Sequence, residues 1–134
     1  MVGEHNISFQ FQTRYFTSGE LTPHTKKIWF VLHGYGQLAQ YFIRKFKPLS
    51  DAGIYVVAPE GLSKFYLEDV TTRGRTGNQK VGATWMTREN RLTDINNYLR
   101  YLNLVYDQLV PKNFAGEITV LGFSQGAATA ARWV

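Results

Sequence analysis

Short apolar runs divide the sequence into a series of predicted strands. Residues 27–32, 54–58 and 118–123 are rich in apolar and β-branched residues, and each run ends close to a glycine or proline. Such runs indicate buried strands. Residues 8–16 instead alternate between polar and apolar positions, the period of two expected of a half-exposed strand. Strands that are apolar on both faces are typical of a parallel sheet.

Apolar residues spaced three and four apart predict helices between these strands. The first helix covers residues 38–49, and Pro48 and Gly53 are expected to close that segment. The most regular pattern predicts a helix from a cap at Thr87 to a stop at Pro111, and a third helix begins at Ser124. The apolar positions of the second helix are Leu92, Ile95, Leu99, Leu102, Tyr106 and Leu109. Because strands and helices alternate, the sequence predicts an α/β fold with a largely parallel sheet.

Composition limits the class of protein. The 134 residues fit one compact domain, and 44% hydrophobic with 19% charged residues is typical of a globular chain. The first ten residues show no signal-peptide pattern, and no apolar run is long enough to cross a membrane. We therefore expect a cytoplasmic protein without an integral membrane segment. The chain has no cysteine, which excludes disulfides and thiolate metal sites.

The formal net charge of +5 raises the question of an anionic partner. Basic residues are densest between Lys64 and Arg91, but residues 71–80 contain no aromatic side chain and the chain carries no nucleic-acid-binding motif. We therefore expect no nucleic acid as a partner, and interpret the charge as a basic loop beside a pocket.

A G-x-S-x-G motif supplies the first candidate for chemistry. Gly122-Phe123-Ser124-Gln125-Gly126 lies between a predicted strand and a predicted helix, as a nucleophile elbow requires. Glycines on both sides allow the close packing of that turn, while the serine is held exposed in a strained conformation. Ser124 is thus the candidate nucleophile. The backbone N–H of Gln125, at the start of the helix, is a candidate oxyanion donor.

A second motif follows the strand at residues 27–32. His33-Gly34-Tyr35-Gly36 stands where hydrolases with a nucleophile elbow place the loop that gives the other oxyanion donor. Tyr35 N–H is our candidate for it, with Gly34 and Gly36 shaping the loop. We expect His33 to support this loop rather than act as a general base.

Together these motifs resemble the phospholipase/carboxylesterase family, which includes carboxylesterases and acyl-protein thioesterases. The similarity runs from Ile28 to Trp133 and also includes the strand end Val56-Val57-Ala58-Pro59. The resemblance implies an α/β-hydrolase fold and hydrolysis of a small-molecule ester or thioester through an acyl-serine, with no metal and no organic cofactor. It also implies that an aspartate and a histidine beyond the elbow complete the triad.

The sequence departs from the family after the elbow. Residues 125–134 contain no Asp, Glu or His, and of His5, His24 and His33 only the last is expected near Ser124. We therefore expect residues 1–134 to be the N-terminal part of a single α/β-hydrolase domain, truncated after the elbow and nearly inactive alone. The alternative is a short, non-catalytic binding module that keeps the fold.

The long excursion between residues 62 and 86 is the least regular part of the chain. Its aromatic and apolar side chains either line an acyl-binding groove or cover the core. The residues concerned are Phe65, Tyr66, Trp85 and Met86, with Arg73 and Arg75 expected near the mouth of such a groove.

A dinucleotide-binding domain is a further alternative. Residues 34–39 fit G-x-G-x-x-A between a strand and a helix, and Glu60 follows the next strand. That hypothesis leaves the turn at Ser124 unexplained. The sequence does not determine the oligomeric state.

Overall fold

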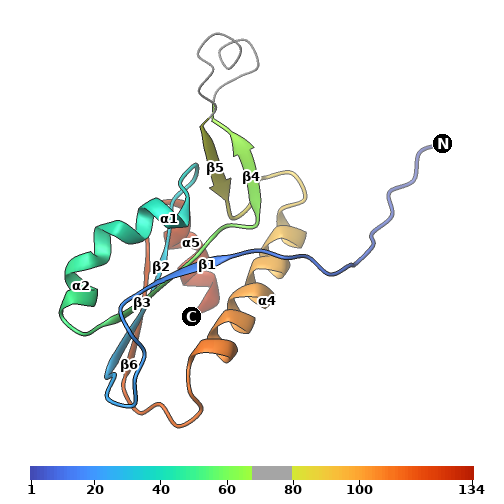
Figure 1. Ribbon diagram of the computed structural model, residues 1–134. Coiled ribbons are helices and arrows are strands. Elements are labelled where there is room, and N and C mark those ends of the chain that lie inside the picture. The colour runs from blue at the N-terminus through green and yellow to red at the C-terminus, as the bar shows by residue number, and fades with distance from the viewer. Residues whose placement is uncertain (68–79) are drawn as a thin grey trace.

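The computed structural model describes residues 1–67 and 80–134 and consists of a mixed sheet with helices on both faces, plus a separate hairpin (Figure 1). Strand order in the sheet is β1-β3-β2-β6; β1 runs antiparallel to β3, and the other pairs are parallel. The elements are β1 (Tyr15–Ser18), β2 (Lys27–Leu32), α1 (Ala39–Phe42), the 3₁₀ helix η1 (Ile43–Phe46), α2 (Lys47–Asp51), β3 (Tyr55–Pro59), β4 (Ser63–Tyr66), β5 (Val81–Thr84), α4 (Arg91–Leu109), β6 (Glu117–Gly122) and α5 (Gln125–Trp133).

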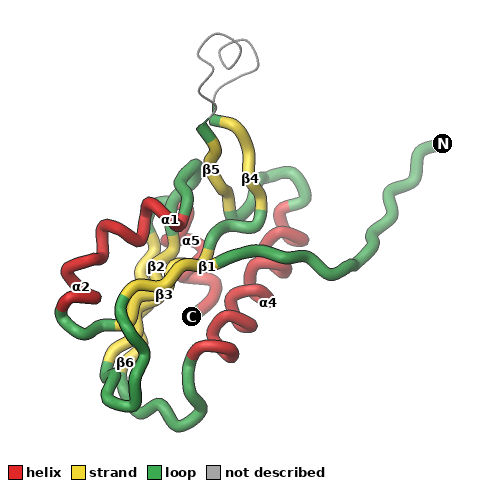
Figure 2. Tube along the Cα trace, viewed as in Figure 1, coloured by secondary structure: helices red, strands yellow, loops and turns green. Residues whose placement is uncertain are grey.

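Helices lie on both faces of the central strands (Figure 2). Alternate side chains of these strands pack against the opposite layers. Val31 and Val56 face the α1–α2 segment, where they join a cluster with Phe42. Phe30 and Val57 face the other layer, made by α4 and α5. The run of apolar residues in β2 and β3 thus serves both faces, as expected of strands inside a parallel sheet.

The predicted strand over residues 8–16 is wrong for most of its length. Only Tyr15 and Phe16 of that range lie in β1, which continues to Ser18, and residues 1–12 are exposed. The register explains the difference, because Tyr15 pairs with Pro59, the last residue of β3. Upstream of Tyr15 there is no strand to pair with, and the chain leaves the sheet (Figure 1).

The predicted helices form with corrected boundaries. The segment 38–49 becomes three short pieces, and Pro48 lies in the first turn of α2 rather than at its end. A proline is tolerated there because the first-turn N–H groups have no intrahelical acceptor. α4 begins at Arg91 instead of following a cap at Thr87, whose N–H donates to the Asp94 carboxylate.

The excursion between β3 and α4 contains an antiparallel hairpin, in which Ser63 of β4 pairs with Thr84 of β5. This hairpin lies beyond the carboxyl ends of the parallel strands, where ligands bind in open α/β sheets (Figure 1). Throughout residues 1–67 and 80–134, no helix has both the length and the apolar character needed to span a bilayer.

Candidate functional site

Ser124 occupies a strained turn between β6 and α5. Its φ of 57° and ψ of −118° lie outside the conformations that non-glycine residues usually adopt. Within the described residues, only Asn90 shares a positive φ without being glycine. A backbone in such a region costs on the order of 1–3 kcal/mol, so the surrounding packing must hold it. The Ser124 side chain is exposed, at the N-terminus of α5.

Two glycines make that turn sterically feasible. A Cβ on Gly122 would overlap the carbonyl of Gly126, and a Cβ on Gly126 would overlap the carbonyl of Leu32 at the end of β2. The backbone of Phe123 extends the sheet by donating to the same Leu32 carbonyl over 3.0 Å. The first turn of α5 is therefore pressed against the strand that leads into the His33 loop.

That loop lies directly beside the elbow. A Cβ on Gly34 would be 3.1 Å from the Phe123 carbonyl oxygen, and Gly36 has a φ of 79°, a left-handed conformation that glycine adopts without strain. The Gln37 side chain closes the loop, since its Oε1 accepts the Gly34 N–H at 2.6 Å. The Gly36 N–H donates to the carbonyl of Ala83 at 2.9 Å.

The backbone N–H groups of Tyr35 and Gln125 at this junction donate no hydrogen bond within the described part of the chain. The Gln125 group stands in the first turn of α5, where N–H groups have no intrahelical acceptor and the helix dipole favours negative charge. N–H groups from two separate elements can therefore donate hydrogen bonds to an oxyanion bound here.

His33 is fully buried, and both of its ring nitrogens have partners. Nε2 accepts the Gly61 N–H at 2.9 Å, so the proton resides on Nδ1, which donates to the Gly34 carbonyl at 2.8 Å. Burial lowers the pKa of His33, while its hydrogen bond to Gly34 and the charge of Glu60 act in the opposite direction. This neutral imidazole braces the loop and has no nitrogen available to receive a proton from Ser124.

The side chain of Gln125 forms hydrogen bonds that no sequence motif predicted. Oε1 accepts the Trp85 N–H at 2.9 Å, and Nε2 donates to the Thr84 hydroxyl and to the Met86 carbonyl, both at 2.9 Å. The only indication of these bonds in the sequence was the residue type, because a glutamine side chain can donate and accept hydrogen bonds at once.

From the sequence, Glu60 was a candidate only for a dinucleotide-binding site. Its carboxylate is fully buried, pairs with Arg14 at 2.7 Å and accepts the N–H of Ala39 at 3.1 Å. Lys64 lies 3.6 Å away. The carboxylate thus links the residue before β1, the start of α1 and the hairpin, and it is too buried to contact a ribose.

The candidates for an acyl groove divide between core and surface. Trp85 is buried, stacks on the His33 ring with centroids 5.1 Å apart and donates its Nε1–H to the His33 carbonyl, so it belongs to the core. Phe65 packs against Tyr35 at 5.0 Å, whereas Tyr66 is exposed. Arg73 and Arg75 lie outside the described residues.

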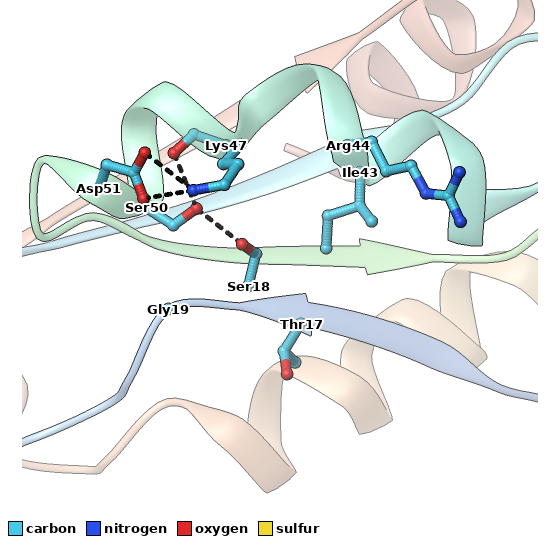
Figure 3. Close-up of a pocket in the computed structure, with 8 residues that line it drawn as sticks. All are labelled: Thr17, Ser18, Gly19, Ile43, Arg44, Lys47, Ser50 and Asp51. Carbon is cyan, nitrogen blue, oxygen red and sulfur yellow. Dashed lines mark hydrogen bonds and ion pairs between the residues drawn. The ribbon is translucent and has the colours of Figure 1, made fainter.

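Neither of two surface hollows includes the elbow or the His33 loop. One of about 330 Å³ lies between the end of β1 and the α1–α2 segment, where Ser18 and Ser50 share a hydrogen bond (Figure 3). Another of about 630 Å³ lies between the end of α4 and the start of β6. Across residues 1–67 and 80–134 no group of three His, Asp or Glu side chains is placed to hold a metal ion.

A mixed sheet with a strained serine after one strand and a glycine loop after its neighbour defines the α/β-hydrolase fold. The family model described as serine hydrolase (FSH1) matches residues 22–134. This chain therefore belongs to the serine hydrolase family, and the class predicted from the sequence is confirmed. The family that matches bears a different name from the phospholipase/carboxylesterase family that the motifs resemble.

The structural comparison agrees on the fold. A solved structure described as a lipase in an open form superposes with a TM-score of 0.58 at 16% sequence identity, over 87% of this chain. The chain spans about a third of that lipase's length, with 33% of it covered. A search of curated proteins gives no significant match.

Proposed function

We propose that this protein hydrolyses carboxylic esters or thioesters of small molecules through an acyl-serine formed on Ser124. The observation that carries the proposal is the strained, exposed Ser124 at the N-terminus of α5. Strain of this kind is retained at sites where surrounding packing enforces a functional geometry. Membership of a serine hydrolase family supports the same role.

In the proposed reaction, Ser124 Oγ attacks the carbonyl carbon of the substrate and gives up its proton to a general base. The negative charge that develops on the carbonyl oxygen is stabilised by the N–H groups of Tyr35 and Gln125. Collapse of this intermediate releases the alcohol or thiol and leaves the acyl group on Ser124. Water then attacks the acyl-serine by the same route, which frees the acid and the serine.

The general base lies outside the 134 residues in this proposal. His33 uses both nitrogens, and His24 precedes β2 at the amino end of the sheet. Since β2 has six residues of about 3.3 Å each, His24 is separated from the elbow by roughly 20 Å of strand. We propose that residues 1–134 form the N-terminal part of one α/β-hydrolase domain whose acid and base come from further chain.

Labelling with a fluorophosphonate tests the nucleophile, since this probe forms a phosphonyl adduct with an activated serine. In the form that includes the proposed further chain, we expect one adduct on Ser124, found by peptide mass spectrometry, and none in Ser124→Ala. Ser8→Ala is the matched control, because Ser8 lies in the exposed N-terminal stretch and its loss leaves labelling unchanged. The chain is assayed alone and with the downstream coding sequence, and hydrolysis of p-nitrophenyl and thioester substrates is followed in parallel.

One observation favours a second candidate function, that of a non-catalytic binding module: no imidazole in the described structure is available to Ser124. If neither residues 1–134 nor the extended form gave an adduct, the result would support the non-catalytic binding module. An adduct only in the extended form would support the enzyme and the external base together.

A further inference from the structure

We infer that residues 83–86, at the end of β5, form a brace that holds both candidate oxyanion donors at a fixed separation. The hairpin is a separate element from the sheet that carries Ser124. Its last residues nevertheless form hydrogen bonds to the His33 loop, which contains Tyr35, on one side and to the elbow on the other. The inference deepens the proposed function, because it rests on Tyr35 and Gln125 being the oxyanion donors.

The first arm of the brace is made by backbone groups of Ala83. Its carbonyl accepts the Gly36 N–H at 2.9 Å, and its N–H donates to the Gln37 carbonyl at 2.9 Å. Gln37 forms an isolated antiparallel bridge with Ala83, so the loop is paired like a short strand. These two bonds hold Gly36 and Gln37 in place. The Tyr35 N–H belongs to the same peptide group as the Gly34 carbonyl, which accepts the Gln37 N–H at 3.2 Å, so fixing Gln37 restrains the direction of the Tyr35 N–H.

The second arm is the Gln125 side chain. Its three bonds to Thr84, Trp85 and Met86 use the amide oxygen and nitrogen, all at 2.9 Å. The Thr84 hydroxyl also donates to the Met86 carbonyl at 2.7 Å. Gln125 therefore contributes twice: its backbone N–H is the oxyanion donor and its side chain positions that donor.

Close packing leaves the brace little freedom. Ala83, Thr84 and Trp85 are all buried, and a Cβ on Gly61 would lie 2.8 Å from the Thr84 carbonyl carbon. The Trp85 indole bonds to the His33 carbonyl at 2.9 Å, which links the brace to the end of β2. Buried, fully bonded polar networks rigidify a structure, so a change at one arm is transmitted to the other.

The first test needs no enzymatic activity and measures amide hydrogen exchange by NMR in the full chain. Gln125→Met keeps the length of the side chain but removes all three bonds. We expect faster exchange at the Trp85 N–H, which loses its acceptor, and also at the Gly36 N–H on the opposite arm. Faster exchange at Trp85 with Gly36 unchanged would show that the arms are independent and overturn the inference.

Two further variants control for folding and for the substitution itself. Thr84→Val is a milder change that removes only the hydroxyl contacts, and it is expected to shift both amides in the same direction as Gln125→Met. Gln108→Met makes the same chemical change on α4, where the side chain bonds to the Tyr15 hydroxyl. Neither the Trp85 nor the Gly36 amide should respond to it.

The second test measures catalysis in the form of the protein that labels at Ser124. A displaced oxyanion donor weakens the transition state more than substrate binding, so Gln125→Met should lower kcat by about 10- to 100-fold. KM should stay within about 3-fold, because ground-state binding does not use the oxyanion contacts. The inhibition constant of an aryl boronic acid, which forms a tetrahedral adduct on the serine, should rise by a factor similar to the loss in kcat.

The two proposals fail in different ways. A kcat unchanged in Gln125→Met, in a protein whose turnover requires Ser124, would overturn the brace and leave the hydrolase intact. Absence of Ser124-dependent turnover in the wild type would overturn the hydrolase, and the exchange of the Gly36 amide would still decide whether residues 83–86 couple the two loops.

Discussion

Acidification should destabilise this protein through His33. The side chain is fully buried and neutral, with Nε2 accepting a backbone N–H and Nδ1–H donating to a carbonyl. Protonation of Nε2 would place two N–H groups against each other at a distance of 2.9 Å. Burial therefore lowers the pKa of His33 in the folded state, whereas in the unfolded chain it returns to its usual value of about 6.5.

The sign follows from the protons bound in each state. Above about pH 6.5 the histidine is neutral in both states, and its contribution to stability is fully present. As the pH falls below that value, His33 binds a proton in the unfolded chain but remains neutral in the folded chain. Each pH unit between the two pKa values then removes about 1.4 kcal/mol of unfolding free energy. The loss ends once the pH falls below the folded-state pKa.

Urea denaturation followed by tryptophan fluorescence measures this effect, and Trp85 stacks directly on His33. The unfolding free energy of the wild type is compared with that of His33→Gln from pH 7.5 to pH 5, so that the titration of other groups cancels. His24→Gln is the matched control, because His24 is exposed. Parallel curves for wild type and His33→Gln would refute the assignment of a buried neutral imidazole, as would an NMR signal showing the proton on Nε2.

Substitutions at three positions test the buried contacts described above, each by its change in unfolding free energy. Gly126→Ala places a Cβ on the Leu32 carbonyl and should destabilise by about 2–4 kcal/mol; a neutral effect would mean that α5 does not press on β2. Glu60→Leu leaves the Ala39 N–H without its acceptor and should cost about 3 kcal/mol, whereas Glu60→Gln, which keeps an acceptor, should cost less. Trp85→Phe removes one buried hydrogen bond and should cost about 1–3 kcal/mol, and a smaller loss would place water at the vacated position.

Local patterns were sufficient where neighbouring residues decide the structure. Residues 27–32 form β2 as predicted, and the run at 118–123 forms β6 with one residue shifted at each end. The turn at Ser124 was predictable because a strand, two glycines and a helix start are all encoded within a few positions. The fold class followed from the alternation of these elements, and the family match confirms it.

Errors arose where a distant partner was needed. Residues 8–14 have the alternation of a strand but no strand to pair with, since β3 ends at Pro59 opposite Tyr15 and the pairing closes with the Glu60 N–H, which donates to the Arg14 carbonyl at 3.2 Å. A strand exists only when its backbone groups find a second strand, and periodicity does not report the partner. The cap predicted at Thr87 is wrong for a different reason, because α4 begins only at Arg91, directly after Asn90 in a left-handed conformation.

The sequence by itself therefore determined the fold class, the elbow and the loop that faces it, because these depend on residue type at short spacing. Only the tertiary structure decided which groups the side chains of His33, Glu60 and Gln125 bond to. Their roles depend on the partners that burial brings to each polar atom, from residues 21 to 46 positions away. A polar side chain taken out of water must be bonded, and which group satisfies it is a property of the packed structure rather than of the local sequence.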